Sequence, residues 1–403
     1  MLKKSNSVLI AYLSGPIDGP AVYDIWQKKS KQPYLGTSYL SQFYDLIDRE
    51  DHSGFVITCL PGRKATSYRK NLKICNIPRD HGASGFWYHL FSAMWVIRST
   101  FLIIAERPKY LIVTDAQDYW FLMLPARLMG IRIIAAYHCT LWPPYQTLKW
   151  HQRTLVSLNS LFLKWCAFGI VTASRTISEQ VRTIVKNNHI TIHEFLPTYE
   201  PSQFALINPP LRQNISPINV LFAGRIEANK GIYDFCEMAT VLSNRYPRRF
   251  NFHICGDGSE LANVKAIAMS SFSEKNLLVH GFCTQQKMID MFSISHIVVV
   301  PTRSDFEEGF AMICAEAILA GRPLVTSAAC PALALLRPAS IEVKVDDVSS
   351  YITAIEQLAN SEAIYESKRL ACKDLQEQFF DCRNSWHMKI RQAMYQTANT
   401  KSH

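Results

Sequence analysis

The sequence is poor in charged residues, and its cysteines do not have the spacing of a zinc finger. Only 19% of the 403 residues are Asp, Glu, Lys or Arg, whereas 48% are apolar, and this balance excludes an intrinsically disordered chain. None of the eleven cysteines forms a CxxC pair, and no other nucleic-acid-binding motif is recognisable. The sequence therefore argues against a nucleic-acid partner. It also lacks internal repeats, which excludes a repeat architecture.

The cysteines occur inside apolar patterns instead. Cys59, Cys236, Cys255 and Cys314 each lie in a run typical of a buried strand or helix, which predicts reduced core thiols in a cytosolic setting. The apolar run near the N-terminus (VLIAYL) is too short for a signal peptide and is interpreted as the first strand. We therefore expect a cytoplasmic protein.

One apolar segment, residues 86–105, has the length of a membrane-spanning helix. His89, Arg98 and several other polar residues interrupt it, and charged groups are costly inside a bilayer. We therefore expect a helix that is buried or that faces an interface, rather than a true span.

The length of the chain exceeds one ordinary hydrophobic core, so we expect two domains. The net charge of +10 is unevenly distributed, because residues 1–200 hold 23 Lys+Arg against 13 Asp+Glu, whereas residues 201–403 hold 20 against 20. A basic first half favours an anionic partner, such as a membrane surface or a lipid phosphate. The alternative is charge that serves only solubility.

Strand-like apolar runs alternate with helix-length segments along the chain, which predicts parallel sheets covered by helices. Residues 201–217 are rich in proline and have little periodicity, as expected of a linker. We therefore predict an α/β protein with a Rossmann-like domain over residues 1–200 and a second one over residues 218–383.

The stretch from Asp305 to Gly321 (DFEEGFAMICAEAILAG) is the most informative part of the sequence. It follows an apolar run, residues 296–301, that is typical of a buried parallel strand. We predict a helix that opens at Gly309-Phe310 and stops at Gly321. The start of such a helix offers free backbone N–H groups and a positive dipole end, which suit a phosphate.

Two carboxylates, Glu308 and Glu316, bracket the start of this predicted helix. Eight steps of about 100° each bring Glu316 within about 80° of Glu308, so both can face one ligand. Ligands of open parallel sheets bind beyond the carboxyl ends of the strands. Three other predicted strand ends in this half carry glycines or cations, namely Gly224-Arg225 with Lys230-Gly231, the turn Gly256-Asp257-Gly258, and His280-Gly281.

These residue types together describe a site for a nucleotide sugar. Arg225 and Lys230 can converge on one diphosphate, the alternative being a solvated pair of loop charges. The glycines of the 256–258 turn let a ligand approach the backbone closely, the alternative being a tight turn alone. Glu316 is placed to pair with ribose hydroxyls, and Glu308 with hydroxyls of a group beyond the phosphates.

With these motifs the chain resembles retaining glycosyltransferases of the GT-B fold, specifically family 4 (glycosyl transferases group 1). The resemblance covers residues 219–327, where Glu308 and Glu316 form an E-x7-E motif. The first half matches only in outline, through Tyr137-His138, a helix cap at Ser174 and the loop at Pro197. The family fold implies two Rossmann-like domains that face each other across a cleft. It also implies a C-terminal helix, at about residues 384–403, that crosses back to the first domain.

The resemblance implies a hexosyltransferase that moves a hexose from a nucleotide diphosphate sugar to a glycan or lipid-linked acceptor with retention of anomeric configuration. Its catalytic residues would be Glu308 at the donor sugar, His138 near sugar and acceptor, and Arg225 and Lys230 at the diphosphate, with Glu316 on the ribose. The other implied donor-binding positions are Gly224, Gly256, Gly258, Gly309, Phe310 and Ala311, and the acceptor-side positions are Gly36 and Thr37. No metal and no cofactor are implied.

The sequence departs from the family pattern in two places. The glycine-rich loop near the N-terminus is reduced to Gly36-Thr37-Ser38 or to the segment 15–19, and the usual Gly-Gly-x-x-Glu is replaced by Ala329-Cys330-Pro331-Ala332. Glu307, beside Glu308, is interpreted as a solvated loop acid, the alternative being a raised pKa. For His138 the alternative is a loop residue without a role.

Family members often act on lipid-linked acceptors at the cytoplasmic face of a membrane. Binding to an anionic membrane would explain the excess of basic residues in the first half, so we expect peripheral attachment. We expect anionic headgroups to contact Lys28, Lys29, Lys31 and the loop from Arg63 to Arg79. We expect Trp87, Tyr88 and Trp95 at the interface between membrane and water. The alternative is that these aromatic residues belong to the core. Other functions stay open, namely a sugar-nucleotide epimerase, a sugar-phosphate synthase, and a catalytically silent membrane-attached binding protein.

Overall fold

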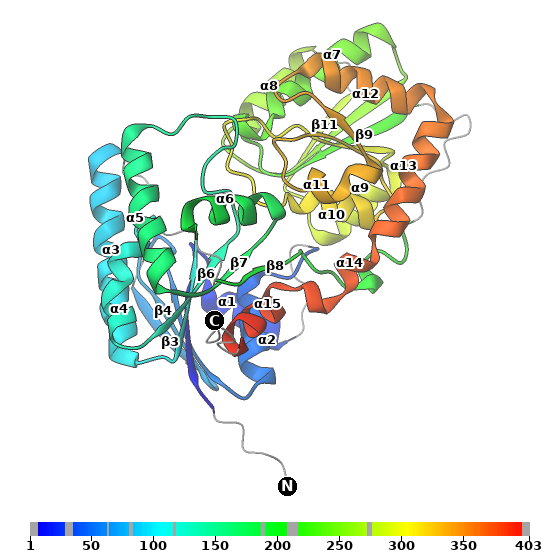
Figure 1. The fold of residues 1–403 in the computed structure, drawn as a ribbon. Coiled ribbons are helices and arrows are strands. Elements are labelled where there is room, and N and C mark those ends of the chain that lie inside the picture. Colours follow the sequence, from blue (N-terminus) through cyan, green and yellow to red (C-terminus); the bar gives the residue numbers. More distant parts are fainter. Residues whose placement is uncertain are drawn as a thin grey trace, which may run out of the picture.

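Two parallel sheets, each covered by helices, make up the architecture (Figure 1). The structure is a computed structural model and describes residues 7–28, 35–62, 64–79, 84–115, 118–186, 190–207, 217–271 and 276–396. The strands of the first sheet lie between residues 9 and 194, and those of the second between residues 218 and 343. The alternation of strands and helices seen in the sequence is thus confirmed, whereas the exact domain boundaries stay predictions.

The first sheet has eight strands in the order β3-β4-β2-β1-β5-β6-β7-β8. Neighbouring strands are parallel except for β3, which pairs antiparallel with β4. The central strands are apolar and buried, because helices cover both faces of a parallel sheet. The strands are β1 (Leu9–Leu13), β2 (Ser53–Thr58), β3 (Ala65–Arg69), β4 (Leu72–Asn76), β5 (Tyr110–Thr114), β6 (Arg132–Tyr137), β7 (Ala167–Thr172) and β8 (Ile192–Glu194).

The helices of the first sheet form two groups (Figure 1). One group holds α1 (Gly19–Gln27) and α2 (Tyr39–Arg49). The other holds α3 (Gly85–Glu106), η1 (Trp120–Met123), α4 (Leu124–Leu128), α5 (Trp150–Cys166) and α6 (Arg175–Val185). The predicted helix starts at Ser38 and Ser174 are confirmed, since each hydroxyl accepts a hydrogen bond from a backbone N–H three residues later.

The second sheet has six parallel strands in the order β11-β10-β9-β12-β13-β14. The strands are β9 (Ile218–Ala223), β10 (Phe250–Cys255), β11 (Leu277–Gly281), β12 (Ile297–Val300), β13 (Leu324–Ser327) and β14 (Ser340–Val343). The helices are η2 (Pro201–Gln203), η3 (Ala228–Lys230), α7 (Ile232–Arg245), α8 (Leu261–Ser271), α9 (Gln285–Ile294), α10 (Met312–Leu319), α11 (Leu333–Leu336), η4 (Arg337–Ala339), α12 (Val348–Asn360), α13 (Glu362–Leu375), α14 (Glu377–Phe380) and η5 (Cys382–Asn384).

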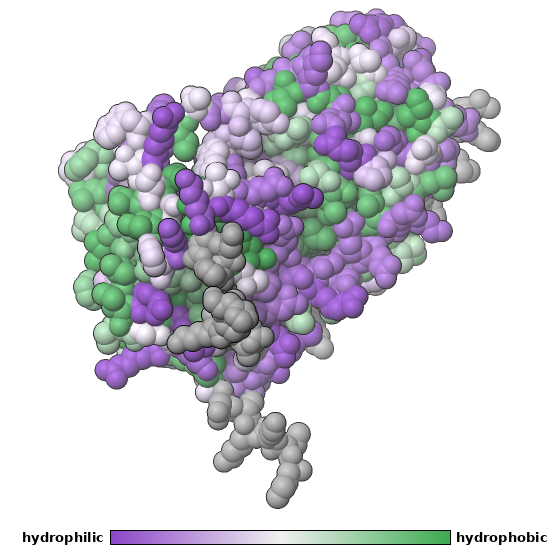
Figure 2. Space-filling model, in the orientation of Figure 1, coloured by the Kyte–Doolittle hydropathy of each residue, from purple (hydrophilic) through white to green (hydrophobic). Residues whose placement is uncertain are grey.

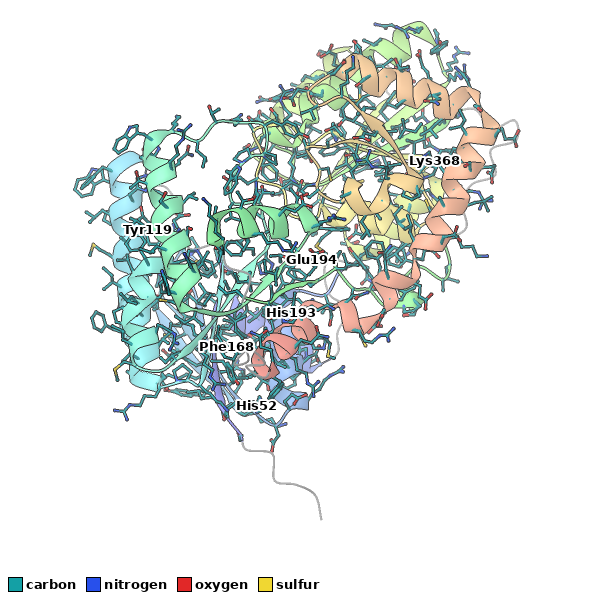
Figure 3. All side chains as sticks on the ribbon, in the orientation of Figure 1. His52, Tyr119, Phe168, His193, Glu194 and Lys368 are labelled. Carbon is teal, nitrogen blue, oxygen red and sulfur yellow. The ribbon has the colours of Figure 1, made fainter. Side chains whose placement is uncertain are left out.

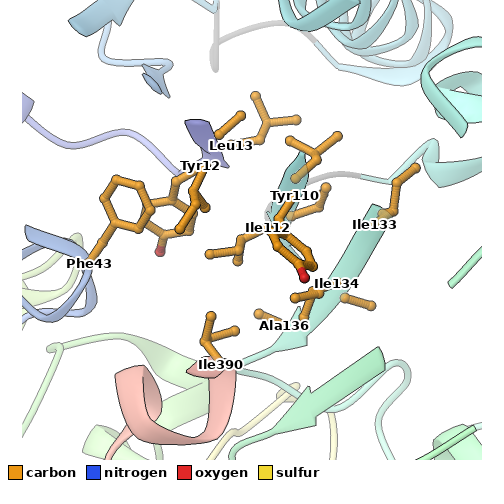
Figure 4. Close-up of a cluster of buried hydrophobic side chains, with 14 of the residues drawn as sticks. Tyr12, Leu13, Phe43, Tyr110, Ile112, Ile133, Ile134, Ala136 and Ile390 are labelled. Carbon is orange, nitrogen blue, oxygen red and sulfur yellow. The ribbon is translucent and has the colours of Figure 1, made fainter. Parts of the chain in front are cut away.

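The last described helix, α15 (Trp386–Tyr395), returns to the first domain, as expected from the resemblance. Trp386 is fully buried there, with its ring centroid 5.3 Å from that of Tyr12 and 6.0 Å from that of Tyr39. Ile390 of the same helix belongs to the first hydrophobic core (Figure 4).

Polar contacts anchor the end of α15 to the sheet. Tyr395 OH lies 3.0 Å from Nε2 of His52, and the side chain of Gln396 contacts both the carbonyl oxygen of Phe168 and Nε2 of His193. Figure 3 labels these three partners on the first sheet, around α15.

The segment from Arg63 to Arg79 is not the loop that its polar sequence suggested. It contains β3 and β4, and the prediction was wrong because β3 is an edge strand whose exposed side chains lack an apolar pattern. Four of its cations also have partners in the protein, since Arg69 pairs with Asp24, Lys70 with Asp48 and Lys73 with Glu106, and Arg79 donates to Ser92. Lys29, Lys31 and Arg63 lie outside the described residues.

The segment 86–105 forms α3, as predicted, but Trp95 was wrongly expected at an interface. Trp95 is buried in the core, where its indole N–H donates to the carbonyl oxygen of Ile77 at 2.7 Å. Tyr88 is half-buried, and Trp87 is exposed. All eleven cysteines are free, and Cys59, Cys236, Cys255 and Cys314 are buried as predicted.

Candidate functional site

A cavity of about 630 Å³ lies between the two domains, at the carboxyl ends of their strands. Residues that follow β6 and β7 line one side, and residues that follow β9, β10, β11 and β12 line the other. Ten of the predicted site residues meet here, namely His138, Gly224, Arg225, Lys230, Gly256, Glu308, Gly309, Phe310, Ala311 and Glu316. The convergence of strand ends predicted from the sequence is therefore present.

Three of the predicted residues do not line this cavity. Gly258 packs against the neighbouring loop, where a Cβ would overlap the carbonyl oxygen of Ile226, so its role is in the turn itself. Gly36 and Thr37 line a second cavity of about 1090 Å³, which shares Leu35 and Gln285 with the first.

A buried ion pair lies in the wall of the first cavity. Nζ of Lys230 is 2.5 Å from Oε2 of Glu308, and the side chains are only 17% and 8% exposed. The hydroxyl of Thr302 donates to the same carboxylate oxygen at 3.1 Å. Such a pair offers a ligand both an ammonium for an anion and a carboxylate for hydroxyl groups.

Arg225 and Lys230 do converge, and an aromatic ring lies between them. The guanidinium of Arg225 is 5.3 Å from the centroid of Phe306, and Nζ of Lys230 is 4.3 Å from it. Arg225 also pairs with Glu227 at 2.9 Å, and its side chain stays 58% exposed. Phe306 was not recognised from the sequence, although its position two residues before Glu308 was a signal.

The loop that carries Phe306 and Glu308 is fixed to the second domain. Arg303 donates to both carboxylate oxygens of Asp234 on α7, at 2.8 and 2.9 Å. The backbone N–H of Ser304 donates to Asp346 at 3.1 Å. Because these contacts tie two neighbouring residues of the loop to the second domain, the loop presents Glu308 in a defined position.

Helix α10 begins later than predicted, at Met312 instead of Gly309-Phe310. The reason is Ala311, whose φ of 57° places it in the left-handed region and interrupts the helix. The interruption frees more donors than a regular helix start would. The backbone N–H groups of residues 309–313 make no hydrogen bond to a described residue, and all five residues line the cavity. They form a ready site for an anion.

Glu316 lies one helical turn inside α10 and reaches the same cavity. The hydroxyl of Tyr199 donates to its Oε1 at 3.4 Å, and burial raises the pKa of Glu316 to about 7. Tyr199 belongs to the segment between the two sheets and was not recognised as a site residue from the sequence.

We expect Glu316→Gln to stabilise the unliganded protein at pH 8. The folded-state pKa of about 7 exceeds the ordinary value of 4.5, so stability falls as pH rises between these two values and stays low above them. Since Glu316 as a whole is only half-buried, we expect a modest increase in Tm, about 2–4 °C for about 1 kcal/mol. Thermal unfolding at pH 4 and pH 8 checks this, and an equal shift at both pH values would contradict it.

His138 lies at the end of β6 in an aromatic environment. Its ring centroid is 4.1 Å from that of Tyr39 and 5.5 Å from that of Phe195. Neither ring nitrogen has a hydrogen-bond partner among the described residues, and burial lowers the pKa of His138 to about 3. The imidazole is therefore neutral at physiological pH, and both of its nitrogens are buried without a partner among the described residues.

Asp115 holds the turn that carries His138. Its carboxylate accepts the backbone N–H groups of His138 at 2.7 Å and Cys139 at 2.5 Å. Burial raises the pKa of Asp115 to about 6. In the sequence Asp115 belongs to a D-x-x-D pair with Asp118, and nothing in the local pattern indicates this contact.

The two domains touch at the cavity through their backbones. The N–H of Thr140 donates to the carbonyl oxygen of Glu308 at 3.2 Å. A Cβ at Gly309 would overlap the carbonyl oxygen of His138, so only glycine permits this approach. The contact places His138 and Glu308 on opposite sides of one narrow gap.

Glu307 is exposed at the cleft, as expected of a loop acid, but its pKa is not ordinary. Partial burial raises the pKa of Glu307 to about 7, and Asp118 and Asp115 across the cleft add to the effect. Glu307 is thus exposed, as interpreted from the sequence, and the upward shift of its pKa comes from burial and from two acids of the first domain.

The described residues contain no group of three or more His, Cys, Asp or Glu side chains that could hold a metal ion. The segment Ala329-Cys330-Pro331-Ala332, which replaces the usual glycine-rich motif, does not line the cavity. Ala329, Cys330 and Ala332 are buried instead.

Comparison with known proteins gives this geometry a context. Residues 207–374 match the family model described as Glycosyl transferases group 1. The alpha-D-kanosaminyltransferase of Streptomyces kanamyceticus is 22% identical over 287 residues, which are 66% of this chain and 72% of that protein.

Solved structures are similar over nearly the whole chain. The sucrose-phosphate synthase from Thermosynechococcus elongatus has a TM-score of 0.69 at 15% identity, covering 96% of this chain and 97% of that one. The trehalose-6-phosphate structure from E. coli bound with UDP-2-fluoro glucose has a TM-score of 0.72 at 12% identity, covering 96% and 99%. The expected GT-B fold is thus confirmed, and the second half of the chain carries a glycosyltransferase group 1 domain.

Proposed function

We propose that this protein is a family 4 glycosyltransferase that moves a hexose from a nucleotide diphosphate sugar to a glycan or lipid-linked acceptor, with retention of anomeric configuration. The observation that carries the proposal is a cavity lined by Arg225, the Lys230–Glu308 pair, Glu316 and five residues whose backbone N–H groups have no partner in the described part of the chain. This set matches the three parts of the donor, namely a diphosphate, a ribose and a sugar.

The diphosphate lies at the start of α10 in this proposal. Its oxygens contact the N–H groups of residues 309–313 and the cations of Arg225 and Lys230. The carboxylate of Glu316 accepts hydrogen bonds from the ribose hydroxyls. Negative charge develops on the diphosphate as the glycosidic bond breaks, so these contacts strengthen in the transition state and lower the barrier.

The sugar occupies the gap between the domains. Glu308 accepts hydrogen bonds from the sugar hydroxyls on one side. The neutral imidazole of His138 makes a hydrogen bond to the sugar from the other side. The acceptor approaches from the first domain, on the side of Gly36 and Thr37 or of the cleft near Asp118. No metal takes part, since the two cations and the N–H groups supply the positive charge at the diphosphate.

Nucleoside diphosphates are expected to raise the Tm of the protein, and this experiment tests the donor site. A panel of UDP, GDP and ADP at one common concentration should raise Tm most for the base that fits, with about 2.7 kcal/mol of stabilisation when that concentration is about 100 times the Kd. Arg225→Ala should weaken the shift, whereas Arg245→Ala, on the far end of α7, should not. A panel in which no nucleoside diphosphate changes Tm would contradict the donor site.

A second candidate, a sugar-nucleotide epimerase, has one observation in its favour. It needs acid and base groups from both domains, and Glu307 faces Asp115 and Asp118 across the cleft. Incubation with the matching nucleotide sugar in the absence of acceptor separates the two functions. An epimerised nucleotide sugar formed without acceptor supports the second candidate. A glycosylated product that forms only after an acceptor is added, and whose new bond keeps the anomeric configuration of the donor by NMR, supports the first. A donor that binds but is never turned over indicates a silent binding protein.

A further inference from the structure

Helices α3, α4 and α5 present an apolar face to the outside of the first domain. Figure 2 shows hydrophobic residues gathered over these helices, on the left of the view. Of the 25 large apolar side chains that are exposed among the described residues, 14 belong to α3, to residues 124–129 or to α5. The other 11 are spread over the rest of both domains.

Helix α3 is apolar on its outer face as well as on its inner one. Phe86, Leu90, Met94, Ile97 and Phe101 recur every three or four residues and are all exposed, so they share one face of the helix. The opposite face packs on the sheet, and it contains three buried hydroxyl side chains, those of Ser92, Ser99 and Thr100. A helix on the surface of a soluble domain normally turns its polar face outward.

Helix α5 and the short α4 extend this face. Trp150 and Trp165 of α5 are 80% and 70% exposed, and Leu128 of α4, which lies between the two longer helices, is 77% exposed. Each of α3 and α5 ends next to the first residues of a strand, so both begin at the cleft end of the sheet. Trp87 and Trp150 therefore lie at that end of the face, and tryptophan favours the boundary between lipid and water.

The charge around the face is positive and largely uncompensated. Residues 85–166 hold eight Lys+Arg against three Asp+Glu. The three acids are engaged elsewhere, since Glu106 pairs with Lys73, Asp115 accepts two backbone N–H groups and Asp118 accepts the hydroxyl of Tyr88. The exposed cations Arg98, Arg127 and Arg153 form no ion pair with a described residue.

We propose that the α3–α4–α5 face docks on a bilayer that contains anionic lipids. Apolar side chains enter the interface and the flanking cations attract the headgroups, a combination typical of proteins that lie on a membrane. Among the described helices, α3 is the one long and apolar enough to cross a membrane, but its inner face is part of the first core, so it lies along the surface. This face differs from the segments expected from the sequence, residues 28–31 and 63–79.

Vesicle flotation of the full-length protein tests the proposal without any nucleotide sugar. We expect binding to phosphatidylcholine vesicles that contain about one third phosphatidylglycerol, and weaker binding when the salt concentration rises from about 0.05 M to about 0.5 M. Absence of binding at low salt, or equal binding to vesicles of phosphatidylcholine alone, would overturn it. Neither result would change the nucleotide-induced Tm shift, so a failure here is distinct from a failure of the donor site.

Two matched pairs of variants assign the binding to this face. Phe101→Glu with Leu128→Glu should lower the partition coefficient more than tenfold, because two apolar side chains that enter the interface are replaced by charges that anionic headgroups repel. Met269→Glu with Leu370→Glu, on equally exposed apolar residues of the second domain, should leave it unchanged. Wild-type partition of the first pair would overturn the proposal. So would a dimer that this pair dissociates without any vesicle binding, because the face would then be an interface between two copies.

Discussion

Replacing Lys230 by alanine is expected to lower kcat about 100- to 1000-fold, the usual cost of removing one donor that stabilises charge in a transition state. The ammonium lies over Phe306, 2.5 Å from Glu308, and is mostly shielded from water. Glu308→Gln should have a similar effect, because it removes the negative charge that pairs with the buried ammonium and leaves only a neutral amide oxygen to accept from the sugar hydroxyls. Steady-state kinetics with the donor found in the nucleotide screen provide the measurement.

The two variants form a test of the pair as well as of each residue. Because the side chains interact directly, the effects of the single substitutions should not add in the double variant. Lys344→Ala and Glu362→Gln, which change exposed residues of the same domain away from the cavity, serve as controls with unchanged kcat. Wild-type turnover in Lys230→Ala with an intact fold would exclude the proposed role at the diphosphate.

Trp386→Ala is expected to destabilise the first domain by about 3–5 kcal/mol, the range for truncating a large buried aromatic side chain. Trp386 is fully buried between α15 and the sheet and packs on Tyr12 and Tyr39. Its ring centroid is also 6.4 Å from that of His138, so the substitution should reduce turnover at temperatures where the protein stays folded. Thermal and denaturant unfolding give the stability, and turnover at low temperature gives the effect on the site.

Two controls separate the packing of Trp386 from other effects of changing α15. Trp386→Phe retains most of the apolar volume and should cost clearly less than the alanine variant. Gln392→Ala changes an exposed position of the same helix and should be close to neutral. If the alanine variant unfolds like the wild type, α15 does not stabilise the first domain as described.

The second domain could be predicted well because its signals are local. Each central strand is an apolar run such as residues 297–300, and the residues that follow it carry the cations, glycines and carboxylates of the site. In a parallel sheet the carboxyl ends meet at one edge. Sequence order alone therefore brought Arg225, Lys230, Glu308 and Glu316 together.

The start of α10 could not be predicted, because alanine gives no warning of a positive φ. Ala311 is a strong helix former, and the sequence therefore favoured a helix that already included it. Its left-handed conformation leaves the N–H groups of residues 309–313 without partners among the described residues. The sequence indicated an anion site in this position, but not the number of its donors.

The first-domain side of the site depends on contacts between distant parts of the chain. Tyr39, Asp115, His138 and Phe195 meet only after the sheet and α2 have formed, and no spacing in the sequence connects them. The sequence also could not predict which face of α3 packs on the sheet, because apolar residues occur all around this helix. Only the fold shows that its hydroxyl groups point inward.

The hydrogen bond from Thr140 to the carbonyl oxygen of Glu308, with Gly309 against His138, makes main-chain atoms responsible for the width of the gap at this point. Side chains elsewhere along the cleft can therefore vary without moving Glu308 relative to His138. In the proposed reaction, a relative with different residues on the first-domain wall would bind a different acceptor and keep the same spacing between Glu308 and His138. Acceptor preference in this architecture is thus free to diversify, whereas any side chain at position 309 would force the domains apart.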